Sequence, residues 1–151
     1  MIITCSDTRI AETDGSGQLI QKLLKDQGHT VVEYHLVKDD PAQIQLWIAR
    51  AMTNEAVQAL IINGGTGISR RDSTFEAVDA MLEKRLPGFG EIFRLLTYQE
   101  MGSPAIMSRA TAGIIKGRCI FSIPGSEHAV KMAMEKLILP ELGHLVQQLS
   151  K

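Results

Sequence analysis

The residues best suited to chemistry stand in one stretch, residues 63–76, where a glycine-rich segment precedes two arginines and a carboxylate. Three glycines, Gly64, Gly65 and Gly67, fall within four residues, which frees the backbone to adopt positive φ and to approach a ligand closely. Consecutive amides in such a loop, together with the start of the next helix, attract phosphate. The stretch therefore indicates an anion site, although glycine-rich connections without a ligand are also common between strands and helices.

The loop matches neither of the two common phosphate-binding motifs. A Walker loop needs Lys and then Ser or Thr directly after its last glycine, whereas Ile68 and Ser69 follow Gly67 here. A dinucleotide fingerprint needs the spacing G-x-G-x-x-G, which these glycines do not have. A phosphate site at this loop must therefore be of another kind.

Other polar residues come directly after other apolar runs that predict strands. In open α/β sheets, ligands collect at the carboxyl ends of the strands, so these residues are expected to converge on one edge. Taken singly, each also has a structural interpretation, such as a solvated turn aspartate or a helix cap. The residues are Ser6 and Asp7 after residues 1–5, Asp39 after residues 29–37, and Pro124, Gly125 and Ser126 after residues 119–123.

The elements that must position these residues alternate between strand and helix. This order predicts a three-layer α/β/α fold with a mostly parallel sheet and one antiparallel hairpin strand, because a three-residue turn cannot connect parallel neighbours. The expected strands are residues 1–5, 29–37, 57–62, 111–115 and 119–123. A polar loop is expected at residues 12–17. The first expected helix stops at Gly28, and the second begins at Pro41 with Asp40 as its cap. A third is expected over residues 73–84 with a Ser73/Glu76 capping box, and a fourth after a turn at residues 86–91. A short helical turn is expected at residues 106–109, and a last helix begins at Ser126 and is restarted or kinked by Pro140.

The composition narrows the class of protein. With 151 residues, 44% of them hydrophobic and 22% charged, the chain is expected to form one globular domain. A net charge of −1 argues against nucleic-acid binding, and no apolar run is long enough to span a membrane. Cys5 and Cys119 have no Cys-x-x-Cys spacing, which favours reduced thiols in a cytoplasmic protein, and the histidines show no metal-ligand spacing.

Four motifs taken together resemble the MoaB/MogA family of molybdenum-cofactor biosynthesis. They are Asn-Gly-Gly-Thr-Gly-Ile-Ser-Arg-Arg-Asp-Ser-Thr at residues 63–74, Pro-Gly-Phe-Gly-Glu at 87–91, Ser-Arg-Ala at 108–110 and Ile-Pro-Gly-Ser at 123–126. The resemblance covers the whole chain, including Ser-Asp-Thr-Arg at residues 6–9, and is closer to the MoaB branch. It implies an α/β/α fold, homotrimers or homohexamers, and binding of molybdopterin. In MogA-like members and some MoaB-like ones, the implied activity is Mg-ATP-dependent adenylylation of molybdopterin with release of pyrophosphate.

The resemblance also implies roles for individual residues. Asp39 and Asp72 are the expected catalytic residues, and they are the candidates to hold Mg²⁺, directly or through water. The glycine-loop amides and the helix start at Ser73 suit the nucleotide phosphates, whereas Ser108, Arg109 and the turn at residues 124–126 are expected on the pterin side. The expected substrate- and nucleotide-binding residues are Ser6, Asp7, Gly64, Gly65, Thr66, Gly67, Arg71, Glu91, Ser108, Arg109, Pro124, Gly125 and Ser126.

Three functions remain open from the sequence. The first is a molybdopterin adenylyltransferase with ATP as co-substrate. The second is a protein of the same pathway that binds molybdopterin without turnover. The third is an unrelated flavodoxin-like nucleotide binder, which would leave the three later motifs unexplained.

Overall fold

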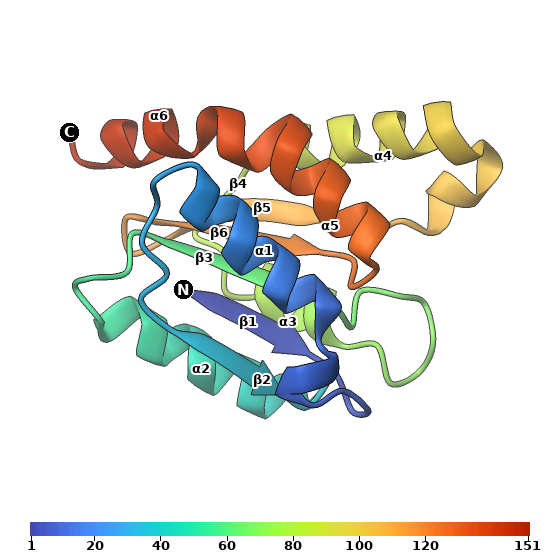
Figure 1. Cartoon of the computed structure of the whole chain (residues 1–151), viewed down its shortest axis with the longest axis horizontal. Helices are drawn as coiled ribbons and strands as arrows, with labels where there is room; N and C mark the ends of the chain where they lie inside the picture. The colour runs from blue at the N-terminus through green and yellow to red at the C-terminus, as the bar shows by residue number, and fades with distance from the viewer.

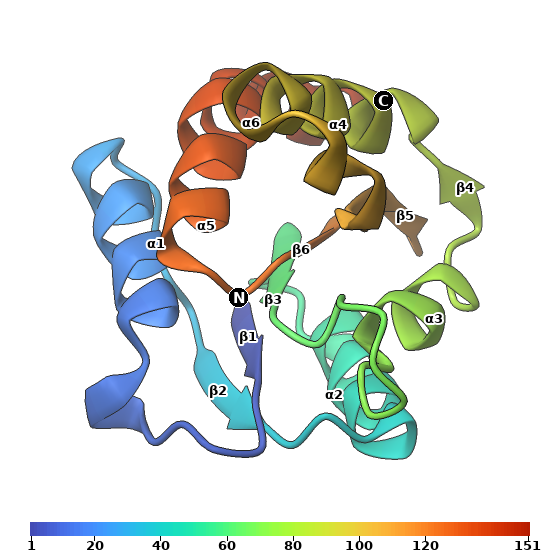
Figure 2. The ribbon, with the colours of Figure 1, turned by 90° about the vertical axis from the view of Figure 1, so that its right-hand side faces the viewer.

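The computed structural model describes residues 1–151, and its centre is a six-stranded sheet with helices on both faces (Figure 1, Figure 2). The strand order is β2-β1-β3-β6-β5-β4, and β5 runs antiparallel to both of its neighbours while the other pairs are parallel. The predicted mostly parallel sheet with one antiparallel strand is therefore confirmed. The strands are β1 Ile2–Cys5, β2 Tyr34–Val37, β3 Ala59–Asn63, β4 Lys84–Arg85, β5 Thr111–Ile115 and β6 Arg118–Ile123.

The helices form two layers, which Figure 2 shows nearly end-on. Helices α1, α4, α5 and α6 cover one face of the sheet, and α2 and α3 cover the other. They are α1 Gly15–Asp26, α2 Pro41–Thr53, α3 Thr74–Asp79, α4 Pro87–Met101, α5 Glu127–Ala133 and α6 Leu139–Leu149. Short 3₁₀ segments occupy Ala11–Thr13 and Ser103–Met107, and a π-helical segment, Met134–Ile138, joins α5 to α6. No helix combines the length and the apolar character that crossing a bilayer requires.

The central strand β3 shows why its sequence is a continuous apolar run. Ile61 packs into the core beneath α1, α5 and α6, while Leu60 and Ile62 pack into the core beneath α2 and α3. A strand that is covered on both faces needs apolar side chains at successive positions, and each fully buried isoleucine contributes about 1.5–3 kcal/mol. The packing of β3 therefore fixes the position of Asn63, its last residue, and of the glycine loop that follows at the edge of the sheet.

Two predicted boundaries near the sheet edges are wrong. Strand β2 begins at Tyr34 rather than at residue 29, because its only partner, β1, offers four residues for pairing. The helix expected over residues 73–84 ends at Asp79, because Lys84 and Arg85 instead pair with β5 as the edge strand β4. The sequence did not predict β4, since two charged residues carry no alternating pattern.

Two predicted loops are largely helical. The polar segment at residues 12–17 contains the start of α1, where the Asp14 carboxylate accepts a hydrogen bond from the Gly17 amide at 3.0 Å. The glycines at residues 86–91 lie within the first turns of α4, after Pro87 at its start. A side chain at Gly90 would lie 2.5 Å from the Ala110 carbonyl oxygen, so this glycine permits close packing and does not form a turn.

The structure confirms the predicted caps of α2 and α5 and the break in the helix near Pro140, and it shifts the predicted short helical turn. Asp40 caps α2 by accepting from the Gln43 amide at 3.0 Å, and Ser126 caps α5 by accepting from the Ala129 amide at 3.2 Å. Helix α6 begins at Leu139 directly after the π-helical segment, and Pro140 is its second residue. Because proline has no N–H to donate to the preceding turn, the wider π turn accommodates it without ending the helix. The short helical turn predicted at residues 106–109 is a 3₁₀ segment at Ser103–Met107, which begins three residues earlier and ends two residues earlier.

Candidate functional site

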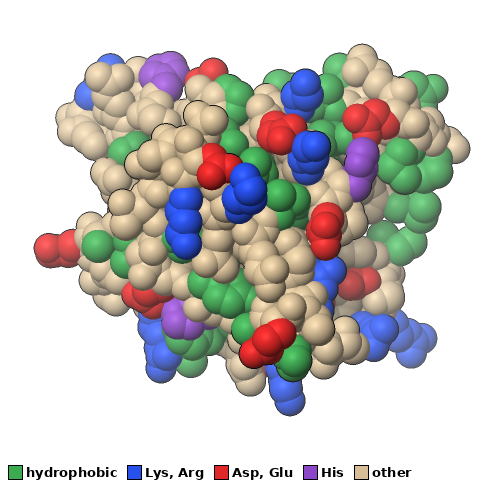
Figure 3. Space-filling model, in the orientation of Figure 1, with side chains coloured by type: hydrophobic (Ala, Val, Ile, Leu, Met, Phe, Trp, Pro, Cys, Tyr) green, Lys and Arg blue, Asp and Glu red, His purple; other side chains and the backbone are tan.

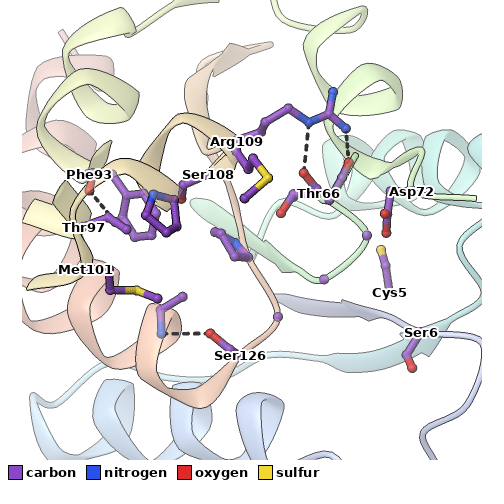
Figure 4. A pocket seen from close by; sticks show the side chains of 18 of the residues that line it. Cys5, Ser6, Thr66, Asp72, Phe93, Thr97, Met101, Ser108, Arg109 and Ser126 are labelled. Carbon is purple, nitrogen blue, oxygen red and sulfur yellow. Dashed lines mark hydrogen bonds between the residues drawn. The ribbon is translucent and has the colours of Figure 1, made fainter. Parts of the chain in front are cut away.

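The carboxyl ends of β1, β3 and β6 border two adjoining cavities. The larger has a volume of about 500 Å³ and the smaller about 180 Å³. They share Cys5, Ser6, Thr8, Gly65 and Asp72 as lining residues, so the two cavities meet at the glycine loop. Figure 4 shows a cavity with Phe93, Thr97 and Met101 of α4 on one side and Asp72 and Cys5 on the other.

The structure brings together all but one of the residues that the sequence nominated. The exception is Glu91, which is exposed on α4 and lines neither cavity. The larger cavity is lined by Ser6, Gly64, Gly65, Thr66, Gly67, Asp72, Ser108, Arg109, Pro124, Gly125 and Ser126. The smaller cavity adds Asp7, Asp39 and Arg71.

The glycines of the loop are required by contacts within the chain itself. Gly64 and Gly65 have φ values of 95° and 63°, in the left-handed region that side chains disfavour. A Cβ at Gly64 would lie 2.2 Å from the Cys5 carbonyl oxygen, and one at Gly65 would lie 2.1 Å from Thr74 Oγ1 and 2.3 Å from Asp39 Oδ2. The sequence predicted that the loop backbone approaches a ligand closely; at Gly65 the groups that it approaches are Asp39 and Thr74 of the protein itself.

The loop carbonyls are hydrogen-bonded, whereas most of its amides are free. The Gly65 carbonyl accepts from the Thr74 amide at 3.0 Å, the Thr66 carbonyl accepts from Arg109 Nε at 3.0 Å, and the Gly67 carbonyl accepts from Arg109 Nη2. The amides of Gly65, Thr66 and Gly67, residues that line the larger cavity, have no acceptor within the chain, and neither has the amide of Ile68, which lies just beyond them in the loop. Consecutive free amides at a cavity wall are donors available to an anion.

The start of α3 differs from its predicted form. Ser73 makes no capping hydrogen bond through its side chain; its hydroxyl instead donates to Asp39 Oδ1 at 2.7 Å, and its amide donates to the same oxygen at 3.1 Å. Glu76, the other half of the predicted capping box, pairs with Arg109. The capping box is thus wrong, because Asp39, from the turn after β2, takes its place. The helix start expected to attract a nucleotide phosphate already holds a carboxylate.

Asp72 is held in a similar way to Asp39. Its Oδ2 accepts from the Ser69 amide at 2.9 Å and from the Ser69 hydroxyl at 2.5 Å. These hydrogen bonds thus use one oxygen of each aspartate, and Asp39 Oδ2 and Asp72 Oδ1 accept no hydrogen bond. No group of three or more His, Cys, Asp or Glu side chains is arranged to hold a metal ion. Two carboxylates are nevertheless a normal protein contribution to Mg²⁺, which completes its coordination with phosphates and water.

The predicted site residues did not include Arg9, which is the centre of a partly buried network of hydrogen bonds. Arg9 lines the larger cavity, donates to the Gly125 carbonyl at 3.0 Å and pairs with Asp14 at 3.4 Å. Asp14 is fully buried and also accepts from the Tyr34 hydroxyl at 2.6 Å. Burial and the neighbouring Asp14 raise the pKa of Tyr34, so its hydroxyl remains a donor. The nearest sequence signal was the position of Arg9 in the Ser-Asp-Thr-Arg motif.

Cys5 lines both cavities as a neutral thiol. Burial raises the pKa of Cys5 to about 12, and the nearby Asp39 carboxylate acts in the same direction. A thiol with such a pKa is a poor nucleophile and a poor metal ligand at neutral pH. Cys5 therefore serves as a wall of the site.

Comparisons with known proteins agree on one family. A family profile described as a probable molybdopterin binding domain matches residues 1–144. Molybdenum cofactor biosynthesis protein B of Halalkalibacterium halodurans is 54% identical over 100% of this chain and 89% of its own length. The Bacillus subtilis protein of the same name is 51% identical over 99% of this chain and 89% of its own length.

Solved structures give the same result for the fold. A crystal structure of a molybdenum cofactor biosynthesis protein B superposes with a TM-score of 0.96 at 52% identity, covering 99% of this chain and 93% of that chain. The tungsten cofactor synthesizing protein MoaB from Pyrococcus furiosus has a TM-score of 0.84 at 37% identity, covering 99% of this chain and 95% of that chain.

Proposed function

The chain belongs to the MoaB family of molybdenum cofactor biosynthesis proteins, and from this premise we propose that it adenylylates molybdopterin. In this reaction the terminal phosphate of molybdopterin takes AMP from Mg-ATP and pyrophosphate is released. The observation that carries the proposal is the row of free amides at Gly65, Thr66 and Gly67, which lies where the two cavities meet beside Asp72. A row of donors next to a carboxylate suits a phosphate that arrives with a cation.

The two cavities differ in the chemistry of their walls. Phe93, Met101 and Met107 supply apolar surface to the larger cavity, which suits a flat pterin ring, and a volume of about 500 Å³ is within the usual range for such a ligand. The smaller cavity has only one hydrophobic residue among eight and includes Asp7, Asp39 and Arg71. We place the pterin in the larger cavity and the polyphosphate across the junction and the smaller one.

The transfer step needs positioning and charge neutralisation more than proton transfer. An oxygen of the molybdopterin phosphate, already deprotonated at neutral pH, forms a bond to the α-phosphorus of ATP. The bond from that phosphorus to the bridging oxygen breaks, and its electron pair leaves with pyrophosphate. The loop amides hold the phosphate oxygens, and Arg9, whose charge is paired with Asp14, adds N–H donors at the wall.

Asp39 and Asp72 are the residues that would hold Mg²⁺. Each has one carboxylate oxygen free of hydrogen bonds, and both side chains line the smaller cavity. When bound, the ion neutralises the charge that builds up on the polyphosphate. The hydrogen bonds from Ser69, Ser73 and Thr74 fix the two carboxylates in place, so that they need no reorganisation when the substrate binds.

One observation favours the second candidate function, binding without turnover. Asp39 already has a structural role at the start of α3, so its presence alone does not require catalysis. Incubation of the protein with molybdopterin and Mg-ATP separates the two candidates. An adenylyltransferase releases pyrophosphate in proportion to added molybdopterin, whereas a binding protein retains molybdopterin and releases none above the no-protein control.

We further propose that the chain acts as a homotrimer or homohexamer through an apolar face on α4. Figure 3 shows hydrophobic side chains gathered over α4 and the 3₁₀ segment after it, at the upper right. Six of the ten exposed large hydrophobic side chains form this α4 face: Ile92, Leu95, Tyr98 and Met101 on α4, and Ile106 and Met107 on the 3₁₀ segment after it. Met101 and Met107 also line the larger cavity, so a second copy on this face would border the substrate.

A matched pair of variants tests this assembly. Leu95→Glu places a charge on the α4 face, whereas Leu46→Glu does so at an isolated leucine of similar exposure on α2, 51% against 54%. Sedimentation at micromolar protein should show a trimer or hexamer for the native chain and Leu46→Glu, and smaller species for Leu95→Glu. A native chain that sediments as a monomer contradicts the proposal.

A further inference from the structure

Arg109 makes contacts that do not suit a residue whose main role is to bind substrate. Its Nε donates to the Thr66 carbonyl at 3.0 Å, its Nη2 donates to the Gly67 carbonyl, and its Nη1 pairs with Glu76. The guanidinium also lies 5.0 Å from the centre of the Phe75 ring. Its positive charge is therefore balanced by Glu76, and only part of its donor capacity is left for a ligand.

These contacts determine the direction of the loop amides. All peptide bonds of the chain are trans, and in a trans peptide the N–H points away from the C=O of the same unit. Arg109 draws the carbonyls of Thr66 and Gly67 towards itself, so the amides of Gly67 and Ile68 point the other way. Figure 4 shows Arg109 above the loop and Cys5 and Ser6 of the cavity wall below it.

We propose that Arg109 is a positioning residue, which orients the amides of Gly67 and Ile68 for the substrate phosphate by holding the two preceding carbonyls. The proposal rests on the proposed function, because it assigns to Arg109 the organisation of the same phosphate site. Glu76 and Phe75 in turn hold the guanidinium in place, from the helix that follows the loop. The hydrogen bond to Arg109 keeps the pKa of Glu76 below its usual value, so this partner stays charged at neutral pH.

Arg109→Lys separates positioning from a direct contact with the anion. Lysine keeps the positive charge, but a single ammonium cannot span two carbonyls and a carboxylate as the planar guanidinium does. Arg109→Ala removes both charge and contacts, and Glu76→Gln removes the charged partner while Arg109 remains. The control is Arg50→Gln, which removes one exposed arginine of α2 that lines neither cavity.

Two measurements are made on each folded variant. The first is the affinity for inorganic pyrophosphate by calorimetry, at several salt concentrations. We expect Arg109→Lys and Arg109→Ala to weaken binding alike, by about tenfold or more, and Glu76→Gln to weaken it by less. The salt dependence should be the same for Arg109→Ala as for the native chain. Arg50→Gln should stay within about twofold.

The second measurement needs no ligand and records the amide NMR signals of Thr66, Gly67 and Ile68. These should move in Arg109→Lys and Glu76→Gln and not in Arg50→Gln. If they move although the native chain binds no pyrophosphate, the proposed function fails while the positioning role stands. If they do not move, the positioning role is overturned. It is equally overturned if lysine preserves the affinity and alanine reduces both the affinity and its salt dependence, because Arg109 would then be a direct ligand.

Discussion

Replacing Asp39 with asparagine should lower both stability and turnover, and the hydrogen bonds of Asp39 give the size of the stability loss. Asp39 Oδ1 accepts from the Ser73 amide at 3.1 Å, from the Ser73 hydroxyl at 2.7 Å and from Thr74 Oγ1 at 3.4 Å. A hydrogen bond to a charged acceptor contributes about 1.5–3 kcal/mol, and one to a neutral acceptor about 0.5–1.5 kcal/mol. The two shorter bonds therefore lose about 1 kcal/mol each, and Asp39→Asn should lower the free energy of unfolding by about 2 kcal/mol.

The substitution should raise the activation free energy of turnover by more than it lowers the free energy of unfolding. Asparagine can still accept the bonds from Ser73, so α3 keeps its start, but the side chain no longer neutralises a divalent cation. A loss of about hundredfold in turnover, or about 3 kcal/mol, is expected for a group of this kind. Asp40→Asn is the matched control, because Asp40 caps α2 and lines neither cavity, and asparagine caps a helix as well as aspartate does.

The assays are urea unfolding at one fixed protein concentration and pyrophosphate release with molybdopterin and Mg-ATP. Equal unfolding midpoints for the two variants would show that the Asp39 carboxylate does not stabilise the start of α3. An equal loss of turnover in both variants would trace the effect to net charge, and would remove Asp39 from the site.

Three further outcomes are expected. Asp72→Asn should lower turnover by about hundredfold in a folded protein, and near-normal turnover would exclude Asp72 from the mechanism. In urea unfolding, Gly65→Ala should destabilise the protein by several kcal/mol more than Gly28→Ala. Both glycines have positive φ, but only Gly65 has atoms within 4 Å of the added Cβ. Equal losses of stability would mean that backbone strain alone accounts for the effect. The hydrogen bond from Arg109 lowers the pKa of Glu76 from 4.5, so its contribution to stability is present above that pH and is lost as the pH falls through the lower folded value. Glu76→Gln should therefore flatten the acid limb of the stability curve, and an unchanged limb would show that the pair does not contribute.

Much of the fold followed from local patterns in the sequence. The continuous apolar run of β3 indicated burial on both faces, and the short turn at Lys116 and Gly117 required β5 and β6 to be antiparallel. Because parallel strands end at one edge, the sequence alone predicted that polar residues after four separate strands belong to one site. Glu91 was nominated only by its motif, and it follows no strand.

The capping box at Ser73 was wrongly predicted because residues distant in the sequence compete for its side chains. Ser73 and Glu76 have the spacing of a capping box, yet Asp39 binds Ser73 from 34 residues away and Arg109 binds Glu76 from 33 residues away. Asp39 gives Ser73 a charged acceptor and Arg109 gives Glu76 a charged donor, whereas the capping box offers each of these side chains only a neutral backbone amide. Local spacing cannot reveal such a partner, and the same holds for the contact of Arg109 with Thr66.

The glycine loop illustrates a further limit. Its composition correctly indicated unusual backbone angles, but the sequence could not tell whether the space beside each glycine belongs to a ligand or to the protein. At Gly65 that space is filled by Asp39 and Thr74. The free amides, by contrast, result from carbonyl contacts that only the folded chain makes.

A crystal structure of the protein grown with pyrophosphate tests the central claim most directly. A phosphate group should lie with its oxygens about 2.7–3.2 Å from the amide nitrogens of the Gly65–Ile68 loop, next to Asp72. Binding of pyrophosphate elsewhere, with these amides facing water or another part of the chain, would contradict the assignment of the loop as the phosphate site.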